Sequence, residues 1–216
     1  MKLPREFYQR PTLTVAQDLL GKCLIRRTEE GLLVGKIVET EAYIGENDLA
    51  CHASRGKTPR NEVMFGEAGH AYVYFTYGMF YCLNVVTEKK GFPAAVLIRS
   101  VEPMEGIKLM IKNRYDETRR SLKRKNSERL ARILLLASDP PDPHIANGPG
   151  KLCQAMKIDK SLNGIDFTGD LLYLKDRGND IQEIVATSRI GVEKAGESAQ
   201  NLWRFYIKES KFVSKK

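Results

Sequence analysis

Glu39 and Glu41 stand two residues apart in the segment VETEAYIGENDLACHASRGKTPR, which spans residues 38–60. On a β-strand, residues two apart share a face, so the two carboxylates would lie side by side. Neighbouring carboxylates raise each other's pKa and burial raises it further, so one of them could act as a general base. The same spacing also fits an exposed strand face with two solvated acids.

The residues that follow this pair favour an enzyme that acts on a polyanion. They are an aromatic residue, Tyr43, a lone histidine, His52, and the cations Arg55, Lys57 and Arg60. Cations can hold phosphates while a carboxylate acts on a group with an aromatic face. The histidine lies in a polar loop, where it can equally be an ordinary surface residue.

Aromatic residues gather in residues 71–86, which predict a β-hairpin that turns at Tyr77-Gly78; they are Tyr72, Tyr74, Phe75, Tyr77, Phe80 and Tyr81. Aromatic side chains are common in strands, yet a tyrosine at a turn is poorly placed for a core. A side chain at the hairpin tip could instead wedge between base pairs. Both interpretations stay open at this point.

Length and composition predict one compact domain. The chain has 216 residues, of which 42% are hydrophobic, and no linker-like segment divides it. The net charge of +8 favours a polyanionic partner, although it also fits a surface that only keeps the protein in solution. Four scattered cysteines and three histidines form no metal-binding pattern, so we expect neither a metal nor another cofactor. No apolar segment is long enough to cross a membrane, so we expect an intracellular protein with reduced thiols.

Hydrophobic patterning predicts strands at residues 22–27, 32–42, 71–77, 79–86, 93–101, 171–174, 184–188 and 203–207. Helices are expected at 14–21, from Glu102-Pro103 onward, at 127–137 and from Pro149 onward. If the strand at 32–42 is unbroken, Ile37 shares a face with Glu39 and Glu41. The expected fold class is α+β, a single compact domain with a curved, mainly antiparallel and open, barrel-like β-sheet surrounded by helices.

Three polar residues at the ends of these elements need partners. Asn84 and Arg99 fall within or at the ends of strands, where each is either a structural hydrogen-bonder or a pocket residue. Lys151 follows Gly148-Pro149-Gly150 at a helix start, where backbone N–H groups and a cation make a weak candidate phosphate site.

Five motifs resemble the alkyladenine (3-methyladenine) DNA glycosylase family of mammals and many bacteria. They occur in family order from about Leu3 to Lys208 and read VETEAYIGENDLACHASRGKTPRN, GHAYVYFTYGMFYCLNVV, AAVLIRSVEP, NGPGKLCQAM and TSRIGVEKAGES…WRFYI. The resemblance implies a glycosylase domain over residues 1–208, followed here by a basic C-terminal tail over residues 209–216. It also implies a monofunctional enzyme without a required metal, which flips alkylated purines out of duplex DNA and hydrolyses the N-glycosidic bond. The substrates implied are 3-methyladenine and 7-methylguanine, with hypoxanthine and ethenoadenine as further candidates.

By resemblance, Glu41 is the general base that activates water, and Arg99 positions the water and the backbone near the base. Tyr43, His52 and Tyr74 resemble the side chains that sandwich and contact the flipped base.

Two further residues carry implied roles. Tyr77 resembles the residue that is inserted into the helix, and Asn84 resembles the group whose clash with the guanine 2-amino group excludes normal guanine. The cations expected to contact the DNA backbone are Arg55, Lys57, Arg60 and Lys151. The segment 114–128 is unusually basic for the family and is either an additional phosphate contact or surface.

The expected partner is double-stranded DNA, bound by a monomer in the cytoplasm, with the nucleoid in a bacterium, or in the nucleus of a eukaryote. Two other functions stay open. A non-catalytic nucleic-acid-binding module would share the charge and the aromatic hairpin but would have no use for Glu41. A nucleoside hydrolase would use Glu41 and the tyrosines but would leave the basic loops and Tyr77 without a role.

Overall fold

The computed structural model describes residues 1–119, 141–179, 181 and 183–216. Its strands are β1 (Cys23–Thr28), β2 (Gly31–Ile44), β3 (Ala71–Thr76), β4 (Phe80–Val86), β5 (Ala94–Glu105), β6 (Leu172–Lys175), β7 (Ile184–Thr187) and β8 (Arg204–Ile207). In this described part of the chain they form one sheet with the order β3-β4-β5-β2-β1-β6, to which β8 adds through β2 and β7 through β8. Every pairing between these strands is antiparallel, and the sheet does not close on itself. The predicted α+β fold with an open sheet is therefore confirmed.

Helices cover this sheet. They are α1 (Arg5–Tyr8), α2 (Thr12–Asp18), α3 (Ile107–Arg119) and α5 (Pro149–Ala155), together with the short 3-10 helices η1 (His52–Arg55), η2 (Glu62–Phe65), η3 (Pro143–Ile145), η4 (Lys160–Leu162) and η5 (Gly196–Gln200). Helix α2 packs on β2 and β5, α5 packs on β4 and β5, and their apolar residues share the main hydrophobic core. The helix expected at 127–137 lies outside the described residues. Among the helices described, none is long and apolar enough to span a bilayer.

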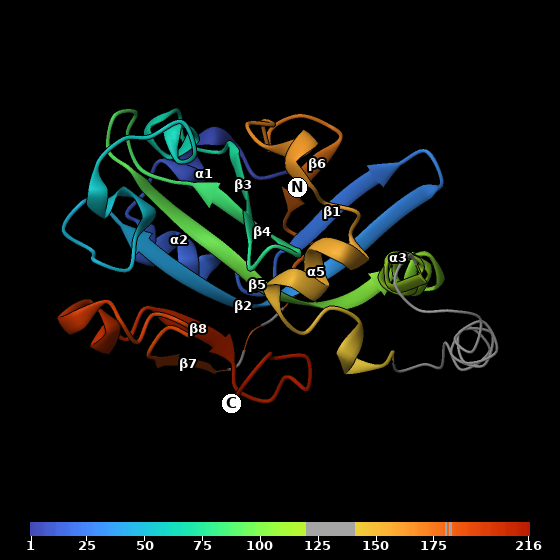
Figure 1. Ribbon diagram of the computed structural model, residues 1–216. Coiled ribbons are helices and arrows are strands. Elements are labelled where there is room, and N and C mark those ends of the chain that lie inside the picture. The colour runs from blue at the N-terminus through green and yellow to red at the C-terminus, as the bar shows by residue number, and fades with distance from the viewer. Residues whose placement is uncertain (120–140, 180, 182) are drawn as a thin grey trace.

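The two long strands β2 and β5 cross the molecule side by side (Figure 1). The first part of β2 pairs with β1, whereas residues 39–41 pair with β8. The register of β2 against β5 shifts between Ile37 and Glu39. The strict alternation of side chains along β2 is therefore interrupted at this point. As a result Ile37 packs in the main core, and the expectation that it shares a face with Glu39 and Glu41 is wrong.

A second irregularity lies opposite, in β5. Glu39 pairs with Ser100 and Thr40 pairs with Ile98, which leaves Arg99 as an extra residue between them. Because a bulge lets two consecutive side chains turn to the same side, Arg99 and Ser100 both reach the Glu39 carboxylate. The bulge thus places an arginine where a regular strand would point it away.

The helix expected to open at Glu102-Pro103 begins later. Strand β5 continues through Glu105, and α3 starts at Ile107, after Gly106 with a φ of 74°. A Cβ at Gly106 would lie 2.3 Å from the Leu32 carbonyl oxygen, so the chain can turn here only at a glycine. Helix α3 turns an apolar face to the core, because Met110 and Ile111 are buried and Ile107 packs against it.

Helix α2 also differs from its expected bounds of 14–21. It starts at Thr12, directly after Pro11, and the Thr12 N–H donates to the Glu88 carboxylate. The division between a domain at 1–208 and a tail at 209–216 stays a prediction. Within the latter range, Phe212 and Val213 are buried and Ser214 bonds to Glu39.

Candidate active site

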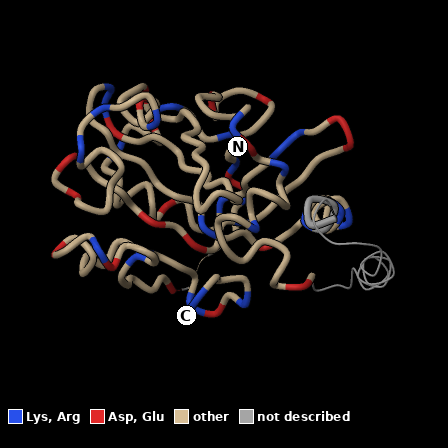
Figure 2. Tube along the Cα trace, viewed as in Figure 1, with Lys and Arg blue, Asp and Glu red and all other residues tan. Residues whose placement is uncertain are grey.

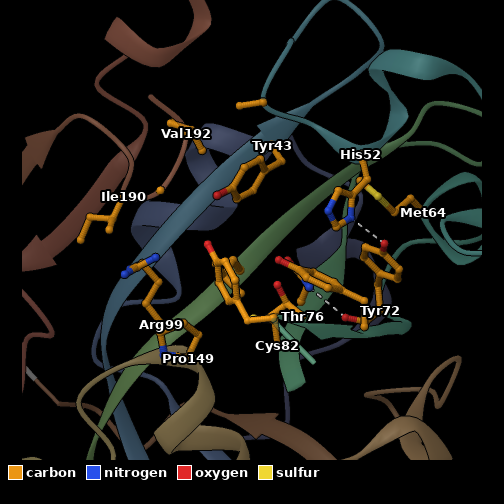
Figure 3. A pocket seen from close by; sticks show the side chains of 16 residues that line it. Tyr43, His52, Met64, Tyr72, Thr76, Cys82, Arg99, Pro149, Ile190 and Val192 are labelled. Carbon is orange, nitrogen blue, oxygen red and sulfur yellow. Dashed lines mark hydrogen bonds between the residues drawn. The ribbon is translucent and has the colours of Figure 1, made fainter. Parts of the chain in front are cut away.

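A cavity of about 290 Å³ opens between β2, the β3–β4 hairpin, β5 and the segment after β7. It brings together six of the predicted site residues, which are Tyr43, His52, Tyr74, Tyr77, Asn84 and Arg99. Figure 3 shows Tyr43, His52, Tyr72, Arg99 and Val192 arranged around this space. Segments distant in the sequence therefore meet at a single pocket.

Glu41, the predicted general base, lies directly behind the pocket wall and is fully buried. Its Oε2 accepts hydrogen bonds from the Tyr43 hydroxyl at 2.9 Å and from Arg99 Nη1 at 3.0 Å, and both donors line the pocket. Its Oε1 accepts the backbone N–H of Ile190 at 2.7 Å. Among the residues that the structure describes, Oε1 therefore has one donor where Oε2 has two, which leaves room on Oε1 for a further donor.

Glu39 has a different environment. Its carboxylate accepts from Arg99 Nε at 2.9 Å, Arg204 Nε at 2.7 Å and the Ser100 hydroxyl at 3.0 Å, and also from the backbone and hydroxyl of Ser214. Burial acts to raise the pKa of Glu39, but the charges of Arg99 and Arg204 and the Ser214 N–H outweigh it, so its pKa is lowered. Five donors bind this carboxylate, so Glu39 joins β2, β5, β8 and the C-terminal segment and is not available to take a proton.

Arg99 lies between the two carboxylates. Burial acts to lower the pKa of Arg99, but Glu41 and Glu39 raise it above its ordinary value, so the guanidinium stays charged. Its side chain is fixed at Nε by Glu39 and at Nη1 by Glu41. This arrangement leaves the Arg99 side chain with little freedom to rotate.

The Tyr43 ring forms one wall of the pocket. The guanidinium of Arg189 lies 4.7 Å from the centre of this ring, and Arg189 is itself held by Asp48 through two bonds of 2.6 and 2.7 Å. Burial and the neighbouring Glu41 raise the pKa of Tyr43, so its hydroxyl stays protonated and donates to that carboxylate.

His52 and Tyr74 form the opposite side. Their rings meet edge to face at 4.5 Å, and His52 Nδ1 lies 2.8 Å from the Tyr72 hydroxyl (Figure 3). His52 as a residue is exposed, but the pocket removes water from its ring. This desolvation and the charge of Arg60 lower the pKa of His52 from 6.5 to about 4, so the ring is neutral at neutral pH. A neutral imidazole does not repel a cationic ring bound in the pocket.

Asn84 is buried at the pocket floor, and its amide nitrogen donates to the Tyr72 carbonyl at 2.9 Å. This bond fixes the orientation of the Asn84 side-chain amide, with its nitrogen on the Tyr72 carbonyl. The residue can therefore present a fixed shape to whatever enters the pocket.

Tyr77 occupies the tip of the β3–β4 hairpin. Its side chain is 80% exposed, and its φ of 52° lies in the left-handed region that non-glycine residues seldom adopt. Beside it runs a second hollow, lined by Leu49, Arg55 and the segment 191–195. An exposed aromatic ring at the mouth of an aromatic pocket has no packing role in the domain.

None of the four predicted backbone-binding cations lines the pocket itself. Arg55 is exposed and lines the hollow beside Tyr77, and Lys57 pairs with Glu62. Arg60 donates to the Phe75 carbonyl and lies over the Tyr74 ring. Lys151 donates to Asn147, next to Pro149 at the pocket edge; burial lowers the pKa of Lys151. Figure 2 shows Lys and Arg spread along the trace with acidic residues between them.

Residues 189–192 are part of the site but were not identified from the sequence alone. The N–H of Ile190 binds Glu41, and Gly191 and Val192 line the pocket. The buried Arg189–Asp48 pair secures this segment. The signal available was an arginine directly before the apolar residues Ile190 and Val192, since an arginine among buried residues requires a partner. In the part of the chain that the structure describes, no cluster of His, Cys, Asp or Glu could hold a metal ion.

Comparison with known proteins gives one consistent family. The chain matches the family described as methylpurine-DNA glycosylase (MPG) over residues 6–211. It is 54% identical over 216 residues to a protein of Methanocella arvoryzae named "Putative 3-methyladenine DNA glycosylase", covering 99% of this chain and 96% of that protein. Proteins of the same name from Clostridium acetobutylicum and Desulfitobacterium hafniense are each 46% identical, with 99% and 100% of this chain and 98% and 99% of theirs covered. The chain therefore belongs to the methylpurine-DNA glycosylase family, DNA repair enzymes that hydrolyse N-glycosyl bonds.

Proposed function

We propose that this enzyme turns alkylated purines, above all 3-methyladenine and 7-methylguanine, out of duplex DNA and hydrolyses their N-glycosidic bonds. The observation that carries this proposal is the pairing of Glu41 with Arg99 immediately behind an aromatic pocket. The products are the free base and an abasic site, and the reaction needs no lyase step. The enzyme acts as a monomer in the compartment that holds the chromosome.

The aromatic hairpin supports base flipping. Turning a nucleotide out of the stack costs a few kcal/mol, and the exposed Tyr77 ring is placed to fill the vacancy. The flipped base then stacks between Tyr43 on one side and His52 and Tyr74 on the other. Stacking on an aromatic side chain contributes about 1–3 kcal/mol per base.

The chemical step uses the acceptor position that remains on Glu41. A water molecule there gives one proton to the carboxylate while its oxygen bonds to C1′ of the sugar. The bond from C1′ to the purine nitrogen breaks, and its electron pair leaves with the base. Positive charge builds up on the sugar in the transition state, as in glycoside hydrolysis. The negative Glu41 carboxylate stabilises this charge.

Selectivity for alkylated bases follows from charge. A purine methylated at N3 or N7 is a cation, so it is attracted to the faces of Tyr43 and Tyr74 and leaves as a neutral base. The neutral His52 ring does not oppose its entry. Neutral purines such as hypoxanthine and ethenoadenine lack this activation and would be released more slowly. The fixed Asn84 amide would clash with the 2-amino group of normal guanine.

The test is release of free base from duplex DNA that contains 3- and 7-methylpurines. The wild type should release base, whereas Glu41→Gln should lose at least about a hundredfold in single-turnover rate, the lower end for loss of a general base. The variant should still bind damaged DNA, because the stacking residues remain.

The matched control is Glu102→Gln, since Glu102 forms a partly exposed pair with Lys36 outside the pocket. This control should keep the wild-type rate. Turnover by Glu41→Gln at the wild-type rate would remove Glu41 from the proposed role. Damage-specific binding without base release by the wild type would contradict the proposed reaction itself.

A further inference from the structure

The guanidinium of Arg99 has a third anchor besides the two carboxylates. Its Nη2 donates to the hydroxyl of Ser214 at 3.3 Å, while Nε and Nη1 donate to Glu39 and Glu41. Each nitrogen of the guanidinium thus has its own partner. Only Ser214 among these partners comes from outside the central strands β2 and β5.

The Ser214 hydroxyl bridges two groups of the site. It accepts from Arg99 and donates to Glu39 Oε1 at 2.8 Å, and the Ser214 backbone N–H donates to Glu39 Oε2 at 2.7 Å. Hydrogen bonds to charged groups are stronger than neutral ones. A single residue therefore helps to fix both the arginine and the carboxylate that holds it.

The segment around Ser214 is packed in place. Phe212 and Val213 are each only 7% exposed, and the Phe212 N–H donates to the Ser210 hydroxyl. Arg204, which also binds Glu39, donates to the Lys215 carbonyl. These contacts hold the C-terminal segment against Glu39 and Arg204.

We propose that Ser214 is a positioning residue for base release, which holds the Arg99 guanidinium at the angle that presents Nη1 to Glu41. The inference rests on the proposed function of Arg99 and Glu41. Ser214 touches neither the base nor the water and acts only through Arg99 and Glu39. Without its hydroxyl, Nη2 loses its partner and the two carboxylates alone hold the guanidinium, so the angle of Nη1 towards Glu41 is less firmly fixed.

The experiment compares Ser214→Ala, Ser214→Thr and wild type in single-turnover release of 7-methylguanine from duplex DNA. Ser214→Ala removes the hydroxyl's bonds to Arg99 and to Glu39. Loss of the bond to the Arg99 guanidinium predicts a rate about tenfold lower for this variant. The affinity for damaged DNA should stay near that of the wild type, whereas the melting temperature should fall by a few degrees because two hydrogen bonds to charged groups are lost. Ser214→Thr keeps the hydroxyl and should restore most of the rate. Ser161→Ala is the matched control, because it removes a similar hydroxyl–carboxylate bond, to Asp159, outside the pocket.

A double-mutant cycle separates positioning from a general structural effect. Arg99→Lys keeps the charge but lacks the Nη2 that Ser214 binds, so Ser214→Ala should slow this variant much less than it slows the wild type. Equal effects on both backgrounds would overturn the inference, as would a Ser214→Ala rate equal to that of the wild type. Failure of the wild type to release base would instead contradict the proposed function.

Discussion

At the scale of single residues, Tyr77 shows a conflict between stability and function. Its φ of 52° costs about 1 kcal/mol relative to a residue that tolerates the left-handed region. The exposed ring has no packing in the free protein that would offset this cost. The strain fits a residue kept for contact with DNA.

Tyr77→Asn should therefore stabilise the free protein while it weakens the enzyme. Asparagine tolerates the left-handed region, so the melting temperature should rise by about 3 °C. Affinity for damaged duplex DNA should fall, because no ring fills the vacated stack. Calorimetry and a binding titration on the same preparation check both effects. Phe75→Asn, a change to an exposed aromatic residue within the adjoining strand, should not stabilise the protein.

His52 predicts a dependence of stability on pH. Its pKa is about 4 in the folded protein and near 6.5 when unfolded, so between these values the unfolded chain binds more protons. Stability is therefore fully present above pH 6.5 and falls as the pH is lowered towards 4. His52→Gln, which cannot titrate, should lose less stability over this window. Denaturant unfolding of both proteins at pH 7, 5.5 and 4 measures the difference, and identical slopes would contradict the assignment.

At the scale of elements, the sequence predicted much of what surrounds the pocket. The hairpin with Tyr77 at its turn was predicted correctly, as was the strand that carries Glu39 and Glu41, because local alternation determines both. The bulges at Val38 and Arg99 were not predictable, since they arise where β2 changes partners from β1 to β8. Such a change depends on strands distant in the sequence.

The same limit explains the contacts that were missed. Ser214 reaches Arg99 across 115 residues of sequence and Arg189 reaches Ala42 across 147, and no local pattern encodes those contacts. The helix predicted from Pro103 was placed too early, because proline also occurs in strands at irregular positions. In β5, Pro103 pairs with Gly35, directly beside a register shift.

The segment 189–192 gives a prediction about a buried charge. Asp48 and Arg189 have no exposed side-chain surface, so Asp48→Asn leaves the arginine charge without its counter-ion. This should lower the free energy of unfolding by about 3 kcal/mol. It should also slow base release, because Ile190 would be held less firmly against Glu41. Asp18→Asn, which breaks the exposed pair with Arg10, should cost less than about 1 kcal/mol in the same unfolding assay.

At the scale of the whole molecule, the net charge of +8 predicts binding that depends on salt. Each phosphate neutralised adds about 0.9 to the slope of log affinity against log salt concentration. Arg55→Ala should reduce this slope by about 1 if the residue contacts a phosphate. Lys160→Ala, an exposed change on η4 outside the pocket and the hollow, should leave the slope unchanged. Equal slopes for both variants and the wild type would remove Arg55 from the DNA interface.

To an approaching DNA strand, the charges of Glu39, Glu41, Arg99 and Arg204 cancel, because two negative and two positive groups lie together. The far field of such a group decays much faster than that of a single charge, so the buried carboxylates do not repel the phosphates that the outer cations attract. Glu41→Gln breaks this balance and leaves one uncompensated positive charge below the pocket. The inactive variant should hold DNA more tightly than the wild type, most of all in low salt. The affinity for DNA measured with Glu41→Gln would therefore be higher than the affinity of the active enzyme.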